Sequence, residues 1–524
     1  MRVKQFYKRY WLTALIGMAF SIFLYSMLMS HQLTNTFDGL WHQNFHHAGI
    51  SELTSGRWLL HYLDKLTMGL HADPITSIVA LGLFVLGFLL VLDLFDVENR
   101  TVAILSLLLW CSSTVIINTL SYRMTSIAYA LSYLLAVLSV YAAVKLRNRF
   151  LAVAVSGLAL GLSMSCYQTY LGVFCVVAVF YLILRCRAPR KQDRDLSALL
   201  RYVLRIGCAA IVGGIVYVVS LSFFLKLNAA TLSDYNGAGG ITLSGLITGL
   251  PESIGKTYRY FGRYYLSDAL KLNRLQYFGI FYVLLALLAA LLILVGVRAW
   301  KTNKLRLLVL VPAALLIPVA CNAYMLLAGD KLELQMTAGL AMLLPLTVIL
   351  AFSCLPSRRV LRVPCILLCL ALLYGNSVQA WFDQEAMLEG RNACETMMQQ
   401  VISDLKDDRL LSGKHEYFFV GVPARNPFFS VNESFACANE YAQMGNFWVT
   451  GNCGQMSYFG LISKWMGFRL PMSYQHYEDI EAQYDIARMP AFPEEGYIAE
   501  FDDGMVVIKI SEPLPYCDYL FFYQ

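Results

Sequence analysis

Residues 74–94 read PITSIVALGLFVLGFLLVLDL, and this apolar stretch decides the fold class. A helix needs about 20 such residues to cross a hydrocarbon core of about 30 Å. Runs of the same kind recur along the whole chain. We predict spans near 11–30, 74–94, 101–118, 125–144, 150–165, 167–184, 203–225, 277–297, 306–326, 335–354 and 363–380. The sequence therefore predicts a polytopic α-helical membrane protein with about eleven transmembrane helices.

The composition also favours a protein that lies in lipid. Of the 524 residues, 58% are hydrophobic and 15% are charged, and the mean hydropathy is +0.55. Soluble globular domains have about 45–50% apolar and about 25% charged residues. The net charge of +6 would suggest a nucleic-acid partner in a soluble protein, but here the basic residues orient helices in a bilayer, and no nucleic acid is expected.

The basic residues predict the orientation of the spans. Lys and Arg accumulate on the cytoplasmic side because positive segments resist translocation. The N-terminal segment MRVKQFYKRY and the runs RCRAPRKQDR (185–194) and LPSRRVLR (355–362) are therefore expected inside. This predicts a multi-pass protein of the cytoplasmic (inner) membrane whose C-terminus lies outside. Its long outer segments would be 31–73, 226–276 and 381–524.

The chain is expected to divide into a transmembrane module, 1–380, and a C-terminal unit, 381–524. The second unit begins with the helical pattern WFDQEAMLEGRNACETMMQQVISDLKD and continues with the strand-like runs EYFFVGV and GMVVIKI. It is long enough to form its own core. We therefore predict an extracytoplasmic α/β domain.

Some classes of function are disfavoured by what the sequence lacks. The inner loops carry no Gly-rich loop with Lys that would cradle a nucleotide phosphate, so a nucleotide-driven reaction on the cytoplasmic side is not expected. The middle of the spans is nearly free of Asp, Glu, Lys and Arg, and the second half shows no repeat of the first. Ion-coupled transporters usually have such charges and such repeats.

The first outer segment carries the residues best suited to chemistry. Asp38 follows the first span closely and could act as a general base on a substrate at the membrane surface, or it could be a solvated acid or helix cap. Arg57, in the turn SGRW, suits phosphate or carboxylate, or an ion pair with Glu52 or Asp64. His42 and His46 would share one helical face, as zinc ligands or as part of an interfacial aromatic helix.

Other candidates are expected on the same side of the membrane. Arg123 lies in the turn SYRM, and Tyr167 and Gln168 lie in SCYQTYL, where they could bind sugar hydroxyls or satisfy helix ends. In KTYRYFGRYYLSDALKLNR the basic residues Lys256, Arg259 and Arg263 share one face of an aromatic-rich helix. Such a helix lies in the interface and suits a lipid phosphate or any anionic headgroup.

Taken in this order, four features resemble the bacterial Gtr type-II glucosyltransferases, which modify O-antigen and related surface glycans. They are an Asp just after the first span, the turn SGRW (55–58), the turn Cys166-Tyr167-Gln168, and the segment MPAFPEEGYIAEFDDGMVVIKI (489–510). The resemblance covers most of the chain.

The resemblance implies a membrane glycosyltransferase of the GT-C class that transfers a sugar, expected to be glucose, from a polyprenyl-phosphate donor with inversion. In that class an acidic residue of the first outer loop is the catalytic base, and Asp38 matches it, where some relatives carry Glu. The implied partners are undecaprenyl-phosphate glucose, a surface-glycan acceptor, the lipid bilayer, and companion proteins that make and flip the donor. The resemblance establishes no cofactor, and a divalent metal is possible without being indicated.

Other functions stay open at the level of sequence. A flippase or transporter of lipid-linked glycans would bind the same donor without making a bond. A glycan polymerase or ligase would use a lipid-diphosphate donor. The C-terminal unit could itself bind glycan, since the stretch from Phe428 to Phe459 is rich in aromatic residues that either stack on sugars or form a core.

Overall fold

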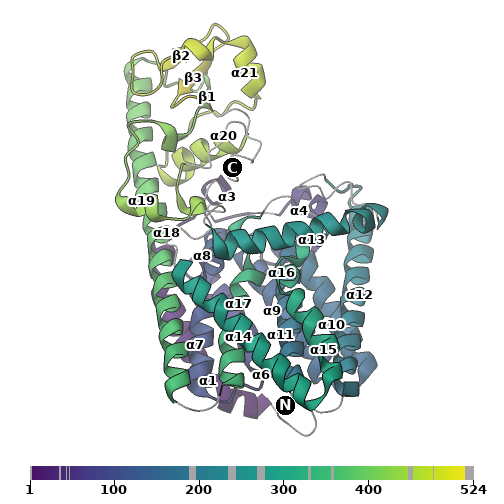
Figure 1. Cartoon of the computed structure of the whole chain (residues 1–524). Coiled ribbons are helices and arrows are strands. Elements are labelled where there is room, and N and C mark those ends of the chain that lie inside the picture. Colours follow the sequence, from purple (N-terminus) through teal and green to yellow (C-terminus); the bar gives the residue numbers. More distant parts are fainter. Residues whose placement is uncertain are drawn as a thin grey trace.

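The protein is a bundle of helices with an elongated tail that rises from one end, as the computed structural model shows (Figure 1). We call this end the tail-side end, and the N-terminus lies at the opposite end. The structure describes residues 3–34, 37–42, 44–46, 48–187, 196–233, 243–267, 278–327, 332–355, 359–445, 452–475 and 477–513.

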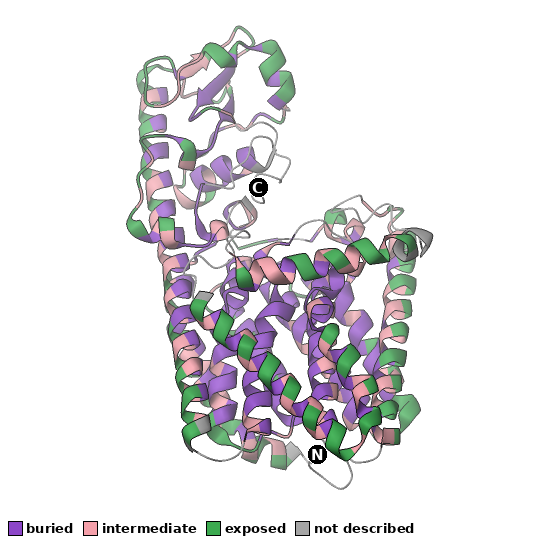
Figure 2. Ribbon diagram, in the orientation of Figure 1, coloured by how far each residue is buried: buried purple, intermediate pink, exposed green. Residues whose placement is uncertain are grey.

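The bundle is built from long apolar helices whose inward faces are buried, while the outer helices expose apolar side chains (Figure 2). Its elements are α1 (Val3–Leu24), α2 (Ser26–His31), α6 (Ile75–Leu94), α7 (Arg100–Cys111), α8 (Thr114–Ser121), α9 (Arg123–Lys145), α10 (Arg149–Cys166), η1 (Gln168–Tyr170), α11 (Leu171–Cys186), α12 (Leu196–Leu227), α14 (Phe278–Thr302), η4 (Lys304–Arg306), α15 (Leu307–Leu315), α16 (Ile317–Cys321), η5 (Ala323–Leu326), η6 (Leu334–Met336), α17 (Ala338–Cys354) and α18 (Arg359–Asp407).

Within the described ranges, seven helices are long and apolar enough to cross a membrane, or eight if α7 and α8, bent by 46°, form one span. The other three predicted spans coincide with α1, with the pair α15 and α16, and with the shorter apolar helix α17. A helical membrane protein is therefore supported, and the number eleven stays a prediction.

Helices α9 and α10 are joined by reciprocal serine pairs. The Ser132 hydroxyl donates to the Ser163 carbonyl at 2.8 Å, and the Ser163 hydroxyl donates to the Ser132 carbonyl at 2.7 Å. Ser139 and Ser156 repeat the arrangement at 2.8 and 2.7 Å. Small residues let helix backbones approach closely, and their hydroxyls add hydrogen bonds where apolar burial between helices contributes little.

Three elements meet closely at the Cys321 carbonyl. A Cβ placed on Gly172 of α11 would lie 2.7 Å from this oxygen, and one placed on Gly339 of α17 would lie 2.3 Å from it. The obstacle in both cases is backbone, which cannot rotate away as a side chain can. The two glycines therefore hold α11, α16 and α17 together at the start of α17.

Four helices lie on or near the tail-side end of the bundle. The segment between α2 and α6 forms α3 (Phe37–Trp41), α4 (Ile50–Thr54) and α5 (Trp58–Leu66). Helix α13 (Leu243–Leu266) runs across this end of the bundle rather than through it (Figure 1). Its Thr257 carbonyl accepts a hydrogen bond from Asn322 at 3.3 Å.

The tail has a hydrophobic core around a small sheet. Strands β1 (Glu416–Val420), β2 (Ile498–Glu500) and β3 (Met505–Lys509) lie in the order β1-β3-β2, with β1 parallel and β2 antiparallel to β3. The remaining elements are η7 (Pro423–Arg425), α19 (Glu433–Cys437), η8 (Glu440–Ala442), α20 (Asn452–Gly460), the π-helix η9 (Leu461–Trp465), α21 (Tyr477–Gln483) and η10 (Ile486–Arg488). The predicted boundary at 380/381 falls inside α18, a single helix of 49 residues that continues from the bundle into the tail.

We expect Gly339→Ala to destabilise the bundle by about 1–3 kcal/mol, because the added methyl group overpacks against a backbone carbonyl. Thermal unfolding in detergent micelles measures the effect. The matched control is Gly279→Ala on α14, where a Cβ meets nothing within 4 Å. Equal unfolding temperatures for the two variants would contradict the close approach at Cys321.

Candidate active site

The segment between α2 and α6, residues 32–74, is held in shape by side chains of α5. One carboxylate oxygen of Asp64 accepts the Ala48 N–H at 2.7 Å. Nδ1 of His61 lies 2.6 Å from the Ala48 carbonyl oxygen and 3.1 Å from that of Gly49. His61 and Asp64 are both buried. These contacts fix the backbone that leads into α4.

A second set of bonds ties the beginning of this segment to its end. The His46 N–H donates to the Gly69 carbonyl at 2.9 Å, and the His71 N–H donates to the Asn44 carbonyl at 3.1 Å. Nε2 of His71 lies 2.8 Å from the His42 carbonyl oxygen. The described residues of this segment are therefore bonded to one another at several points.

Asp38 lies on α3, and its side chain is half-buried. The pKa of the Asp38 carboxyl is raised from its usual 3.8 to about 6, and burial is the largest cause. Charged neighbours act on this pKa in both directions. His46 and Arg57 lower the pKa, whereas Glu52 and Glu333 raise it. A carboxylate with a pKa near neutrality can take a proton from a hydroxyl more readily than an ordinary aspartate can.

His46 and Glu52 form an ion pair beside Asp38. Nε2 of His46 lies 3.5 Å from the Glu52 carboxylate. Burial alone would raise the pKa of Glu52, but His46 and the Ser51 hydroxyl, which donates at 2.8 Å, lower it to about 2. Burial alone would lower the pKa of His46, but Glu52 raises it overall. Glu52 is therefore a fixed anion and His46 its partner, so that neither competes with Asp38 as the base.

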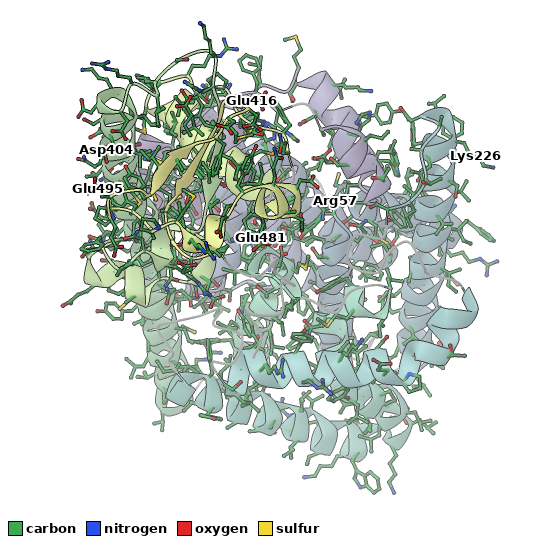
Figure 3. All side chains as sticks on the ribbon, turned by 90° about the horizontal axis from the view of Figure 1, so that it is seen from above. Arg57, Lys226, Asp404, Glu416, Glu481 and Glu495 are labelled. Carbon is green, nitrogen blue, oxygen red and sulfur yellow. The ribbon has the colours of Figure 1, made fainter. Side chains whose placement is uncertain are left out.

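Arg57 lies over a stack of aromatic rings. Its guanidinium carbon is 4.9 Å from the centre of the Tyr167 ring, which stacks on Tyr129 at 4.2 Å. Nη1 of Arg57 donates to the Tyr129 hydroxyl at 3.3 Å. Seen from above, Arg57 lies between the tail, where Glu481 is labelled, and the end of α12, where Lys226 is labelled (Figure 3). A guanidinium over an aromatic ring presents a planar fork of donors, which suits the recognition of a phosphate.

The turn that carries Arg57 interlocks with the turn that carries Gln168. The Gln168 amide donates to the Ser55 carbonyl at 2.9 Å and to the Tyr217 hydroxyl at 3.0 Å. Gly56 has φ +84°, and a Cβ there would lie 2.4 Å from the Tyr217 hydroxyl oxygen and 2.6 Å from the Gln168 nitrogen. The glycine of SGRW is thus required by both its backbone conformation and the neighbours it touches.

The structure gives Arg123 structural partners. Its Nε lies 3.2 Å from the Asp73 carboxylate, and its Nη2 donates to the Asn44 side chain at 3.2 Å. The side chain is only 2% exposed. Arg123 therefore joins α9 to Asn44 and Asp73 of the segment 32–74. Its predicted role in binding substrate stays a prediction that the proposed site does not use.

The three cations of α13 lie on a different element from Asp38. Lys256 pairs with Glu252 at 3.1 Å, Arg263 lies 5.9 Å from the centre of the Tyr260 ring, and Arg259 is exposed. Helix α13, which carries them, crosses the tail-side end of the bundle rather than running through it. Their role as a phosphate site stays a prediction.

The helix expected to carry both His42 and His46 is not observed, because α3 ends at Trp41 and the described residues from His42 to His46 are not helical. The two rings meet edge to face at 4.4 Å, and burial, followed by the charges of His46 and His71, lowers the pKa of His42 to about 4. Among the described residues no group of three or more His, Cys, Asp or Glu side chains could hold a metal ion.

Tyr129, Tyr217 and Glu333 belong to the site but were not singled out from the sequence. Tyr129 and Tyr217 lie within apolar helices, where tyrosine is common and carries no signal of its own. Glu333 lies in the turn AGDKLELQ, whose Asp330 and Lys331 fall outside the described residues. The sequence offered one signal for Glu333, namely that it shares this turn with another acid, Asp330.

One family model, described as glucosyl transferase GtrII, matches residues 42–374 of this chain. The match includes SGRW and the Tyr167-Gln168 turn, and it begins after Asp38 and ends before the tail. Searches of curated proteins and of solved structures found no match. The assignment of Asp38 therefore depends on its position and its environment.

We expect Glu52→Gln to lower the thermal unfolding temperature at pH 6, because His46 loses a charged partner at a cost of about 1–3 kcal/mol. The folded pKa of Glu52 is depressed, so its stabilisation is present above about pH 4.5 and is lost as the pH falls toward 2. The difference from wild type should therefore shrink on acidification. The control is Glu495→Gln, at an exposed position of the tail. A constant difference between Glu52→Gln and wild type at all pH values would contradict the ion pair.

Proposed function

The chain belongs to the glucosyl transferase GtrII family, and from this premise we propose that it transfers glucose from a polyprenyl-phosphate donor to a surface glycan on the outer side of the cytoplasmic membrane. The observation that carries this proposal is that a half-buried carboxylate, Asp38, and a guanidinium over an aromatic ring, Arg57, interact electrostatically at one end of an apolar helix bundle. The proposed reaction needs a base for the acceptor hydroxyl and a cation for the leaving phosphate, and these two residues would supply them.

In the proposed reaction Asp38 is the general base. It takes the proton of the acceptor hydroxyl while the hydroxyl oxygen forms a bond to the anomeric carbon of the donor sugar. The bond between that carbon and the phosphate oxygen breaks, and polyprenyl phosphate leaves with the electron pair. One base and one displacement give inversion at the anomeric carbon. The pKa of about 6 supports this role, since Asp38 is then ionised at neutral pH but still basic enough to accept a proton.

In the same reaction, Arg57 stabilises the leaving phosphate. Charge develops on the phosphate oxygens as the glycosidic bond breaks, and a preorganised cation in a site with little water lowers the energy of that state. Tyr129 and Tyr167 hold the guanidinium in position. Arg57 also acts electrostatically on Asp38, so the base and the phosphate site belong to the same small region.

A lipid-linked donor fits the remaining features of the molecule. The sugar phosphate is already activated, so no nucleotide is needed at the site. The polyprenyl chain would lie in the bilayer while its phosphate lies at headgroup depth, where Lys256, Arg259 and Arg263 of α13 could attract it before it reaches Arg57. Gln168 and Tyr167 would then contact the sugar or keep the Arg57 turn in place.

We expect Asp38→Asn to slow the transfer of labelled glucose from polyprenyl-phosphate glucose to a glycan acceptor by about 10²–10⁴-fold. The reason is that an amide side chain cannot accept the proton of the acceptor hydroxyl. In the wild type, kcat/KM should rise with pH through about 6, because only the ionised carboxylate is active. The control is Asp408→Asn, an exposed acid at the end of α18. Full activity of Asp38→Asn at equal folding would remove Asp38 from the mechanism.

We expect Arg57→Ala to lower kcat by about 10²–10³-fold, because the phosphate loses one preorganised donor. Arg57→Lys should not restore the rate, since an ammonium cannot stack on Tyr167 in the same plane or form a planar fork. The control is Lys226→Ala, an exposed cation at the tail-side end of α12. The same assay gives the result, and equal rates for Arg57→Ala and Lys226→Ala would refute the phosphate site.

A further inference from the structure

We propose that the tail positions the base, by holding α3 from the side opposite the bundle. This inference rests on the proposed function of Asp38. It assigns Leu40 and Gly460 as positioning residues, and it gives the tail a part in catalysis that does not depend on acceptor binding.

The first observation is that α3 is part of the hydrophobic core of the tail. Leu40 is fully buried, and it belongs to the same cluster as Tyr458, Phe459 and Leu461. Trp41 packs against this cluster as a partly buried neighbour. The same core contains residues of α18 and of strands β1 and β3. Asp38 is thus separated by a single residue from a side chain buried in another part of the molecule.

The second observation is a backbone contact without room for a side chain. A Cβ placed on Gly460, the last residue of α20, would lie 2.9 Å from the Leu40 carbonyl carbon and 2.9 Å from the Trp41 nitrogen. Both obstacles are backbone atoms of α3. Any residue larger than glycine at 460 must therefore move α3 or α20.

The third observation is that the bundle holds α3 as well. A Cβ placed on Gly39 would overlap the Thr34 side chain, whose hydroxyl donates to the Ser121 carbonyl of α8 at 3.0 Å. Consecutive residues of a helix point in directions about 100° apart. Because Gly39 packs on Thr34, which is bonded to α8, and Leu40 packs in the core of the tail, the five-residue helix that carries Asp38 is held by both parts of the molecule.

The contact between α3 and α20 should affect the rate of transfer more than the binding of the donor. A base displaced by about 1 Å from its productive position can lose about 10²-fold in rate. Arg57, Tyr129 and Tyr167 are held by α5, α9 and the turn at η1, which do not include the tail. A change at the contact between α3 and α20 should therefore affect proton removal and leave donor binding intact.

The experiment compares Gly460→Ala with Gly413→Ala, a glycine of the same tail whose Cβ would meet nothing within 4 Å. Transfer from polyprenyl-phosphate glucose is measured per folded protein, below the unfolding temperature of each variant. We expect Gly460→Ala to lose about 10²-fold in kcat with an unchanged KM for the donor. The acid limb of its pH profile should also move to lower pH, because a displaced Asp38 is less buried. Gly413→Ala should match the wild type.

Two further variants separate the possible failures. If Asp38→Asn is inactive while Gly460→Ala keeps the wild-type kcat and pH profile, the tail does not position the base and this inference is wrong. If Asp38→Asn is fully active, the proposed function itself fails. Should Gly460→Ala not fold, Leu40→Ala replaces it with the same expected loss in kcat, and wild-type behaviour of that variant overturns the inference in the same way.

Discussion

The hydrogen bonds from buried side chains of α5 to the backbone at Ala48 and Gly49 are the constraint on which the rest of the site depends. Segments of this length without such bonds are open on a protein surface, because their peptide groups must otherwise be satisfied by water. In this protein the buried side chains of Asp64 and His61 bond to the peptide N–H and carbonyl of Ala48. The segment can then lie close to the bundle, and it places His46 and Glu52 beside Asp38. A half-buried carboxylate with a raised pKa is a consequence of that enclosure.

The site also depends on a division of labour between neighbouring charges. Glu52 forms an ion pair with His46, and Arg123 forms one with Asp73. Both residues therefore stabilise the structure. Asp38 and Arg57 differ from them because, in the proposed mechanism, they act on the substrate. One is a carboxylate whose ionised form is disfavoured by burial, and the other is a guanidinium whose carbon lies 4.9 Å from the centre of the Tyr167 ring. In the proposed mechanism the bundle holds the cation and the tail helps to hold the base, so the reaction takes place where the two meet.

The sequence was informative wherever a feature is local. The apolar runs predicted most of the long helices, the run around 74–94 coincides with α6, and the two strand-like runs of the tail coincide with β1 and β3. A boundary at 380/381 followed from the change from apolar to polar composition, but helix propensity continues through it, and α18 is a single helix. The contact of Leu40 with α20 joins residues more than 400 positions apart and leaves no local pattern. For the same reason Arg123 and Arg57 looked alike as arginines in turns, and only their partners distinguish them.

In the proposed mechanism one base and one cation perform a single displacement at this site. The most direct test is the anomeric configuration of the transferred sugar, determined by nuclear magnetic resonance on the product made by the purified full-length protein from a polyprenyl-phosphate donor of known configuration. A single displacement predicts a product of opposite configuration to the donor, since the acceptor hydroxyl attacks from the face opposite the phosphate. Retention of configuration would contradict this mechanism, because retention requires a second displacement and a nucleophile in addition to the base.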